Sequence, residues 1–148
     1  KDLIKEYIKL GGDLNIQDEK GYTPLIFAAY YGHASMVDIL LSAGANPCTE
    51  DKRGNTALMG AIFKGNLKIA YRLIRSDCDV DQRNNSNQTA LMYASLFDRE
   101  ELVEKLVEHG AEVEAIDNQG NTAIGLATKQ GNLKMANLLE ENKRVNDR

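Results

Sequence analysis

The sequence lacks tryptophan and has only two prolines and two cysteines among its 148 residues. Lysine and arginine total 18 against 22 aspartates and glutamates, so the net charge is -4, and no run of five basic residues occurs. Proteins that bind nucleic acid rely on clustered cations, which displace counterions from the phosphates. The charge pattern therefore argues against a nucleic-acid partner.

Long apolar runs are also missing. The longest, around residues 24–31, is much shorter than the roughly 20 residues that a helix needs to cross a bilayer. No segment has the charged-then-apolar pattern of a signal peptide. We expect no membrane insertion. The sequence does not fix a compartment, and a cytoplasmic location is favoured only slightly.

Motifs that support catalysis are absent as well. No serine or cysteine lies in a nucleophile motif with a base partner, and no glycine-rich phosphate loop occurs. Two cysteines and two distant histidines give no metal-ligand spacing. Small secreted domains held by disulfides usually have more cysteines, so Cys48 and Cys78 are expected to be free thiols. The sequence predicts a protein that is not an enzyme and needs no cofactor or metal.

What the sequence does contain is a period of 33 residues, without insertion or deletion. Threonine recurs at this step, at Thr23, Thr56, Thr89 and Thr122. Leucine recurs at the same step, at Leu40, Leu73, Leu106 and Leu139. A period of this length is typical of repeat proteins in which each repeat is one small supersecondary unit.

Each period predicts a turn followed by two antiparallel helices. In the first full unit, residues 18–21 form the turn, Thr23 caps the first helix and Pro24 takes its first position. The first helix of each unit is expected at 24–31, 57–64, 90–97 and 123–130. The second is expected at 34–43, 67–76, 100–109 and 133–143. Such a helix pair buries its apolar face only by stacking on its neighbours.

Helix ends carry their own signals. Glycine ends most of the first helices in the left-handed conformation, and Asp98 takes that place in the third unit. Asn66 and Asn132 precede two of the second helices and are expected to cap them.

The segment Gly21-Tyr22-Thr23-Pro24-Leu25, followed by Ala28-Ala29, Gly32-His33 and Gly44-Ala45, resembles the ankyrin repeat. The resemblance extends over essentially the whole chain and implies an all-α solenoid of stacked helix-turn-helix units. It implies one domain over residues 1–148, with four full repeats after a partial one. The expected boundaries are 1–17 for the partial repeat, then 18–50, 51–83 and 84–116, and 117–148 for the C-terminal capping repeat.

One position departs from the family pattern. Ankyrin repeats usually have a histidine directly after the Thr-Pro-Leu element, where it ties adjacent loops together. That place is taken here by Ile26, Met59, Met92 and Gly125. We expect the loop tie to be weaker here, or to be replaced by packing.

The resemblance implies that a partner protein lies in a concave groove formed by the turn tips and the first, inner helices. Three consecutive units place aromatic or apolar residues at the end of the inner helix, where the fold tolerates polar ones, and the turns add a polar rim. Exposed aromatic patches are typical of interaction sites. The predicted partner-binding residues are Tyr22, Tyr30, Tyr31, Lys52, Arg53, Asn55, Phe63, Lys64, Arg83, Leu96 and Phe97.

An alternative position is open for two residues of this set. Phe63 and Leu96 would then pack between repeats instead of facing a partner. Phe27 and Tyr93 lie earlier on their helices and are expected in the core between repeats.

The favoured function is a non-catalytic adaptor or inhibitor that binds another protein and is monomeric on its own. The alternative is a targeting or scaffold segment of a larger protein whose effector lies outside this chain. A small-molecule or nucleic-acid site has only the four cations Lys52, Arg53, Lys64 and Arg83 in its favour.

Overall fold

The computed structural model describes residues 2–146 and the side chains of residues 3–143. Within this part of the chain every regular element is a helix, which confirms the all-α class. The chain forms two compact units, Lys1–Asp77 and Cys78–Arg148, called unit 1 and unit 2 below.

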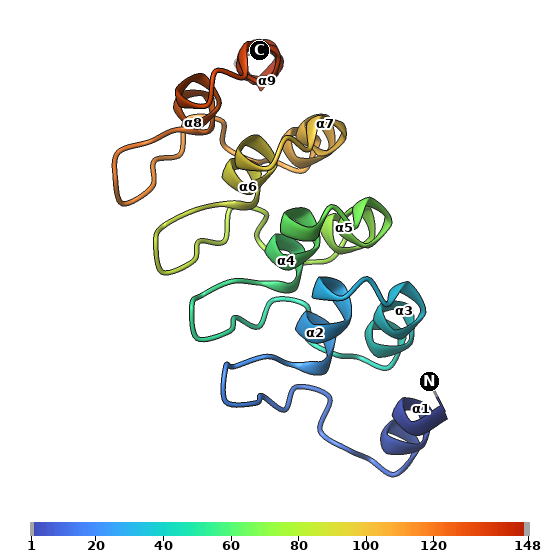
Figure 1. Cartoon of the computed structure of the whole chain (residues 1–148). Coiled ribbons are helices and arrows are strands. Elements are labelled where there is room, and N and C mark those ends of the chain that lie inside the picture. Colours follow the sequence, from blue (N-terminus) through green and yellow to red (C-terminus); the bar gives the residue numbers. More distant parts are fainter. Residues whose placement is uncertain (1, 147–148) are drawn as a thin grey trace. The chain divides into compact units, whose positions relative to one another are not determined.

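Unit 1 contains α1 (Asp2–Lys9), α2 (Pro24–Tyr30), α3 (Ala34–Ser42), α4 (Ala57–Lys64) and α5 (Leu67–Ile74). The inner helices α2 and α4 pack side by side, and each packs against the outer helix that follows it, α3 and α5 (Figure 1). Leu40 of α3 and Leu73 of α5 are both buried. The inner layer and the outer layer of helices therefore share one apolar core.

Unit 2 repeats the arrangement with α6 (Ala90–Leu96), α7 (Glu100–Glu108), α8 (Ala123–Lys129) and α9 (Leu133–Asn146). The inner helices α6 and α8 pack on each other, and so do the outer helices α7 and α9 (Figure 1). The predicted helices are therefore confirmed, with ends shifted by up to two residues, except that α9 extends further than expected.

The repeated threonines cap the inner helices as predicted. Their Oγ1 atoms accept a hydrogen bond from the backbone N–H three residues on, at 3.1 Å for Thr23, 3.3 Å for Thr56 and Thr89, and 3.0 Å for Thr122. Each cap satisfies one of the N–H groups that a helix start leaves without a partner.

The turns also form as predicted. The side chains of Asp18, Asp51, Asn84 and Asp117 each accept hydrogen bonds from the backbone N–H groups two and four residues later. Asn87 and Asp98 adopt positive φ angles of 61° and 58°, at places where other units have glycine. Both residue types tolerate this left-handed conformation better than most.

The two expected asparagine caps have different outcomes. Asn132 Oδ1 accepts a bond from the Met135 N–H at 3.1 Å, as a cap does. Asn66 makes no cap bond, and the prediction for it is wrong. Its amide instead donates to the carbonyl of Ala29 on the neighbouring inner helix, at 2.9 Å. This bond links successive helix pairs, so the residue serves the stacking and not its own helix.

Hydrogen bonds from polar side chains tie adjacent loops together. Gln17 Nε2 donates to the Gly21 carbonyl at 2.8 Å and to the Glu50 carbonyl in the next loop at 2.9 Å. Arg83 occupies the equivalent place in unit 2 and donates to the carbonyl of Ile116 at 2.9 Å. At these two places the residue just before the turn therefore does what the family histidine usually does.

Two further expectations are wrong. Cys48 and Cys78 are both disulfide-bonded, so neither is a free thiol. The cysteine count argued against a scaffold that depends on several disulfides, but it does not report the state of the individual thiols. Phe27 is 45% exposed and not in the core between repeats. Among the described residues, a turn segment and the outer helix α1 precede α2, so no inner helix covers this ring.

Candidate functional site

The inner face of unit 1 brings aromatic side chains from two helices together. Helices α2 and α4 pack side by side and both begin at a threonine cap, so their C-terminal ends lie at the same level. Phe27 comes from the middle of α2, Tyr30 and Tyr31 come from its C-terminal end, and Phe63 comes from the end of α4. We call these four residues the aromatic patch.

The rings of the aromatic patch contact one another in sequence. The ring centroids are 4.6 Å apart for Phe27 and Tyr31, 5.0 Å for Tyr31 and Tyr30, and 6.1 Å for Tyr30 and Phe63. These distances lie in the range of favourable aromatic pairs. Phe27, Tyr31 and Phe63 are nevertheless 45%, 53% and 42% exposed. The patch is held in place by its own contacts and still presents three large apolar side chains to a ligand.

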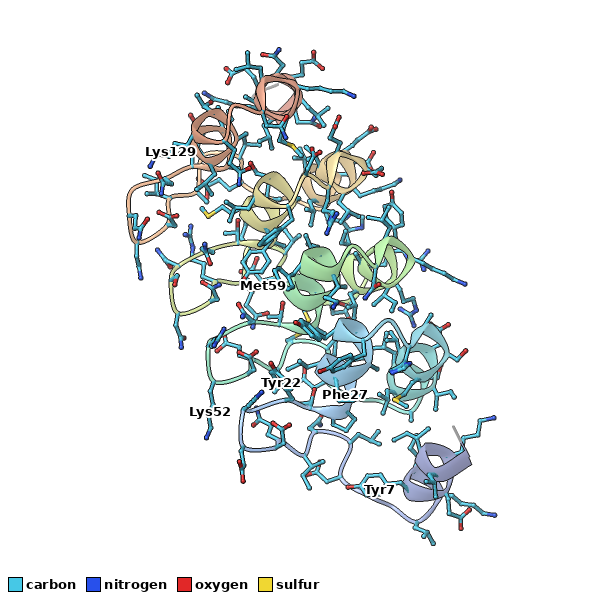
Figure 2. The ribbon with its side chains drawn as sticks, viewed as in Figure 1. Tyr7, Tyr22, Phe27, Lys52, Met59 and Lys129 are labelled. Carbon is cyan, nitrogen blue, oxygen red and sulfur yellow. The ribbon has the colours of Figure 1, made fainter. Side chains whose placement is uncertain are left out.

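One cation borders this patch, and others lie on the turns of the same unit. Lys64 Nζ lies 5.1 Å from the centroid of the Tyr30 ring, within cation–π distance. Lys20 Nζ lies 6.0 Å from the centroid of the Tyr22 ring. Lys52 and Arg53 are exposed at the tip of the turn before α4, and Figure 2 shows Lys52 extending from that tip. The rim of the inner face in unit 1 can therefore contact acidic or carbonyl groups.

Asn55 lies beside this rim and is half-buried. Its backbone N–H donates to Asp51 Oδ1 at 2.9 Å, as does that of Arg53 at 2.8 Å. The Asp51 carboxylate therefore holds the turn in shape while the turn presents its cations.

A cavity of about 280 Å³ lies next to the patch. Tyr22 is half-buried in its wall, and Phe27 belongs both to this wall and to the patch (Figure 2). The remaining lining residues are Ile16, Gln17, Asp18, Thr23 and Pro24. The cavity extends the apolar surface toward the first turn and has room for one side chain of a ligand.

The predicted residues of unit 2 are less available. Leu96 and Phe97 are half-buried at the end of α6, and the Phe97 ring contacts the Tyr93 ring with 5.6 Å between centroids. Arg83 is half-buried, and its Nη1 donates to the carbonyls of Asn87 and Ile116. Its guanidinium therefore serves the loop tie described above.

Of the predicted set, the structure brings Tyr30, Tyr31, Phe63 and Lys64 together in unit 1. Sequence reasoning missed Phe27, because its place early on the inner helix predicted a position in the core between repeats. Its spacing from Tyr31, four residues along one helix, was the available signal. Lys20 was predicted only as part of a polar turn, and no sequence pattern indicated the cavity next to Tyr22.

The described residues give little support for a metal site, a membrane span or a functional histidine. No group of three or more His, Cys, Asp or Glu side chains among them could hold a metal ion. No helix of the described part combines the length and apolarity of a membrane span. His109 Nδ1 lies 2.8 Å from the carbonyl of Lys105 on its own helix, and the His33 ring lies 6.3 Å from that of Phe27.

Two aspartates have shifted pKa values, both for structural reasons. Burial raises the pKa of Asp81, although its carboxylate accepts hydrogen bonds from the Glu112 N–H at 3.1 and 3.2 Å. Burial also raises the pKa of Asp117, but the N–H groups of Asn121 and Gln119 and the nearby Lys129 outweigh it and lower the pKa overall. Both carboxylates bind backbone groups of loops, so neither marks a catalytic site.

Comparison with known proteins agrees with the repeat architecture. The family model of ankyrin repeats, in three copies, matches residues 1–84 and again residues 58–148. The chain belongs to the ankyrin repeat family. Ankyrin repeats indicate a protein–protein interaction module.

Curated relatives share short segments with the chain. It is 57% identical over 37 residues to calmodulin-binding transcription activator 6 of Arabidopsis thaliana, which is 25% of this chain and 4% of that protein. It is 45% identical over 47 residues to the human DNA-binding protein RFXANK, which is 31% of this chain and 18% of that protein. It is 44% identical over 43 residues to the mouse 60 kDa lysophospholipase, which is 29% of this chain and 8% of that protein. The chain therefore spans only a small part of the relatives that it matches.

Proposed function

We propose that this protein is a non-catalytic adaptor or inhibitor that binds a partner protein across its inner face, with the main anchor at the aromatic patch of unit 1. The observation that supports this most is the exposure of Phe27, Tyr31 and Phe63 on two adjacent helices. Contiguous exposed apolar side chains are uncommon on proteins that bind nothing, and aromatic residues are common among interface hot spots.

The cations on the rim indicate which chemical groups the proposed partner offers. Lys64 borders the patch, and Lys20, Lys52 and Arg53 lie on the turns of the same unit, so the proposed partner offers an apolar side chain flanked by acidic or carbonyl groups. The apolar side chain would contact the patch or the cavity beside Tyr22. Burial of apolar area would supply most of the affinity, and the cations would orient the partner.

Other parts of the proposal concern the whole chain. We infer four full repeats after a partial one in a single domain, supported by the four helix pairs from α2 to α9. We also infer a protein that is monomeric on its own and binds no nucleic acid, supported by the net charge of -4. A second candidate function is a targeting or scaffold segment of a larger protein, which is favoured because the matched relatives are all much longer than this chain.

The test is a triple variant with Tyr31→Ala, Phe63→Ala and Phe97→Ala, titrated calorimetrically against a partner purified on the wild-type protein. We expect the binding free energy to weaken by more than about 2 kcal/mol, as is usual for truncated hot-spot residues. A loss below about 1 kcal/mol, with the helical circular dichroism unchanged, would exclude the inner face as the main contact.

A matched control removes exposed apolar side chains elsewhere. Leu10, Ile116 and Leu133 are 77%, 53% and 65% exposed and lie outside the aromatic patch. Their joint replacement by alanine should leave the affinity unchanged. If this control weakens binding as much as the aromatic triple variant, the effect reflects general loss of apolar surface and not a specific site.

A further inference from the structure

The outer surface of unit 1 carries a second feature, distinct from the aromatic patch on the inner helices. A cavity of about 250 Å³ lies between the outer helices α3 and α5. Helix α3 contributes Ala34, Val37 and Asp38 to its lining, and the other side is formed by Lys68, Ile69, Arg72 and Arg75 of α5 and its C-terminal end.

The cavity has an excess of positive charge. Lys68, Arg72 and Arg75 follow one another at steps of four and three residues, so they project from one side of the helix. Helix α5 has no acidic residue. The one carboxylate in the lining is that of Asp38, whose Oδ1 lies 3.5 Å from Arg72 Nε. Three cations therefore face one anion.

Two of these cations are not engaged in ion pairs. Within residues 3–143, neither Lys68 nor Arg75 pairs with a carboxylate. Val37 and Ile69, which are both buried, form an apolar floor beneath them. The aliphatic stems of long cationic side chains can lie along such a floor while the charged ends stay available.

We propose that this cavity binds a phosphate group carried on a side chain of a partner protein, such as phosphoserine or phosphothreonine. A phosphorylated side chain carries a charge of about -1.5 to -2 at neutral pH, which matches the excess of two positive charges. A carboxylate side chain carries one charge and would leave the excess only partly balanced. Arginine forks bind phosphate oxygens in pairs, which adds geometric selectivity.

The size of the cavity supports the same class of ligand. Sites for drug-sized molecules and cofactors usually have volumes of about 300 to 1,000 Å³. A cavity of about 250 Å³ suits a single phosphorylated side chain better than a nucleotide. Because the site lies on the outer helices, this inference does not depend on partner binding at the inner face.

The test follows backbone amide chemical shifts of the full chain by NMR during titration with a short Gly-Ser peptide that carries one phosphoserine. Shifts should concentrate at residues 34–38 and 67–75. The same peptide with an unmodified serine should cause no saturable shifts there. If inorganic phosphate binds as tightly as the phosphopeptide, the site is one for a free anion, and the assignment to a partner side chain is wrong.

Variants decide whether the cavity is responsible. Lys68→Ala together with Arg75→Ala should weaken phosphopeptide binding by roughly 10-fold or more, because two of three cations are lost. Asp38→Asn should strengthen binding, since it removes the competing carboxylate from Arg72. A gain of affinity cannot result from misfolding, so this variant keeps the test valid if the double variant is unstable.

A charge-matched control is available in unit 2. Lys105 and Lys134 occupy outer-helix places equivalent to Arg72 and Lys68 in later repeats. Their joint replacement by alanine changes the net charge by the same amount and should alter the affinity by less than about 2-fold. Equal weakening by both double variants would show unspecific attraction and overturn the proposal. No change with either double variant would also overturn it.

Discussion

The two units build their inner faces on the same backbone but present different side chains. In unit 1, Tyr31 and Phe63 are exposed at the ends of α2 and α4. In unit 2, Phe97 is half-buried at the end of α6, and α8 ends in the exposed polar residues Lys129 and Gln130. The threonine caps and the buried leucines are the same in both. The scaffold therefore fixes the helix starts and the core, and it leaves the ends of the inner helices free to differ.

The outer faces differ in charge in the same way. Helix α5 carries Lys68 and Arg72 without an acidic residue. Helix α7 carries two glutamates in its first turn, one of which, Glu100, pairs with Lys134 Nζ at 3.5 Å. Both helices bury equivalent leucines, Leu73 and Leu106. A chain with a net charge of -4 thus keeps one outer surface that is positively charged.

The largest effect on stability is expected at a turn glycine that lies against the backbone of the next turn, compared with an equivalent glycine that does not. Gly21 and Gly120 have φ angles of 82° and 80° at equivalent places. A Cβ at Gly21 would lie 2.7 Å from the backbone nitrogen of Lys52, whereas a Cβ at Gly120 meets nothing within 4 Å. Gly120→Ala should cost about 1 kcal/mol through backbone strain alone.

Gly21→Ala should cost at least about 1 kcal/mol more than Gly120→Ala, because the clash also disturbs the backbone bond from Lys52 N to Lys20 O. Urea unfolding of both variants measures the difference. Equal losses would mean that the two loops are not held together as described.

A smaller effect is expected at the polar residue that begins each turn. Asp117 accepts bonds from the Gln119 and Asn121 N–H groups at 2.8 and 2.9 Å, and Asn84 makes the equivalent bonds with an amide oxygen. Asp117→Asn should therefore cost less than about 1 kcal/mol at neutral pH.

The pH dependence of this variant has a definite sign. The folded pKa of Asp117 lies below its ordinary value of 3.8, so the charged carboxylate stabilises the fold above that pH. This contribution is lost as the pH falls from 3.8 through the folded pKa. The stability advantage of the wild type over Asp117→Asn should shrink over that range in urea titrations. A constant difference down to low pH would show that the charge contributes nothing.

Much of the fold could be predicted from sequence because the signals are local and repeated. Thr23 and its equivalents start helices through bonds within four residues, and the Asp18-type turns are equally local. The structure departs from the sequence predictions where a side chain forms hydrogen bonds with another repeat. Asn66 has the composition of a cap but donates to Ala29, and Arg83 was assigned to the partner surface but ties two loops.

The candidate site was predicted less completely for a related reason. Exposure depends on which neighbour covers a side chain, and sequence spacing does not report this. Phe27 was expected in the core between repeats, yet it is 45% exposed and joins the aromatic patch. The outer cavity requires Asp38 and Lys68 to come together from different helices. The state of Cys48 and Cys78 likewise depends on the folded structure.

The central claim is that partner binding depends mainly on the aromatic patch of unit 1. The most direct test compares two double variants in calorimetric titrations, Tyr31→Ala with Phe63→Ala in unit 1, and Leu96→Ala with Phe97→Ala in unit 2. We predict a loss of more than about 2 kcal/mol for the first pair and less than about 1 kcal/mol for the second. Equal losses, or a larger loss for the unit 2 pair, would contradict the account.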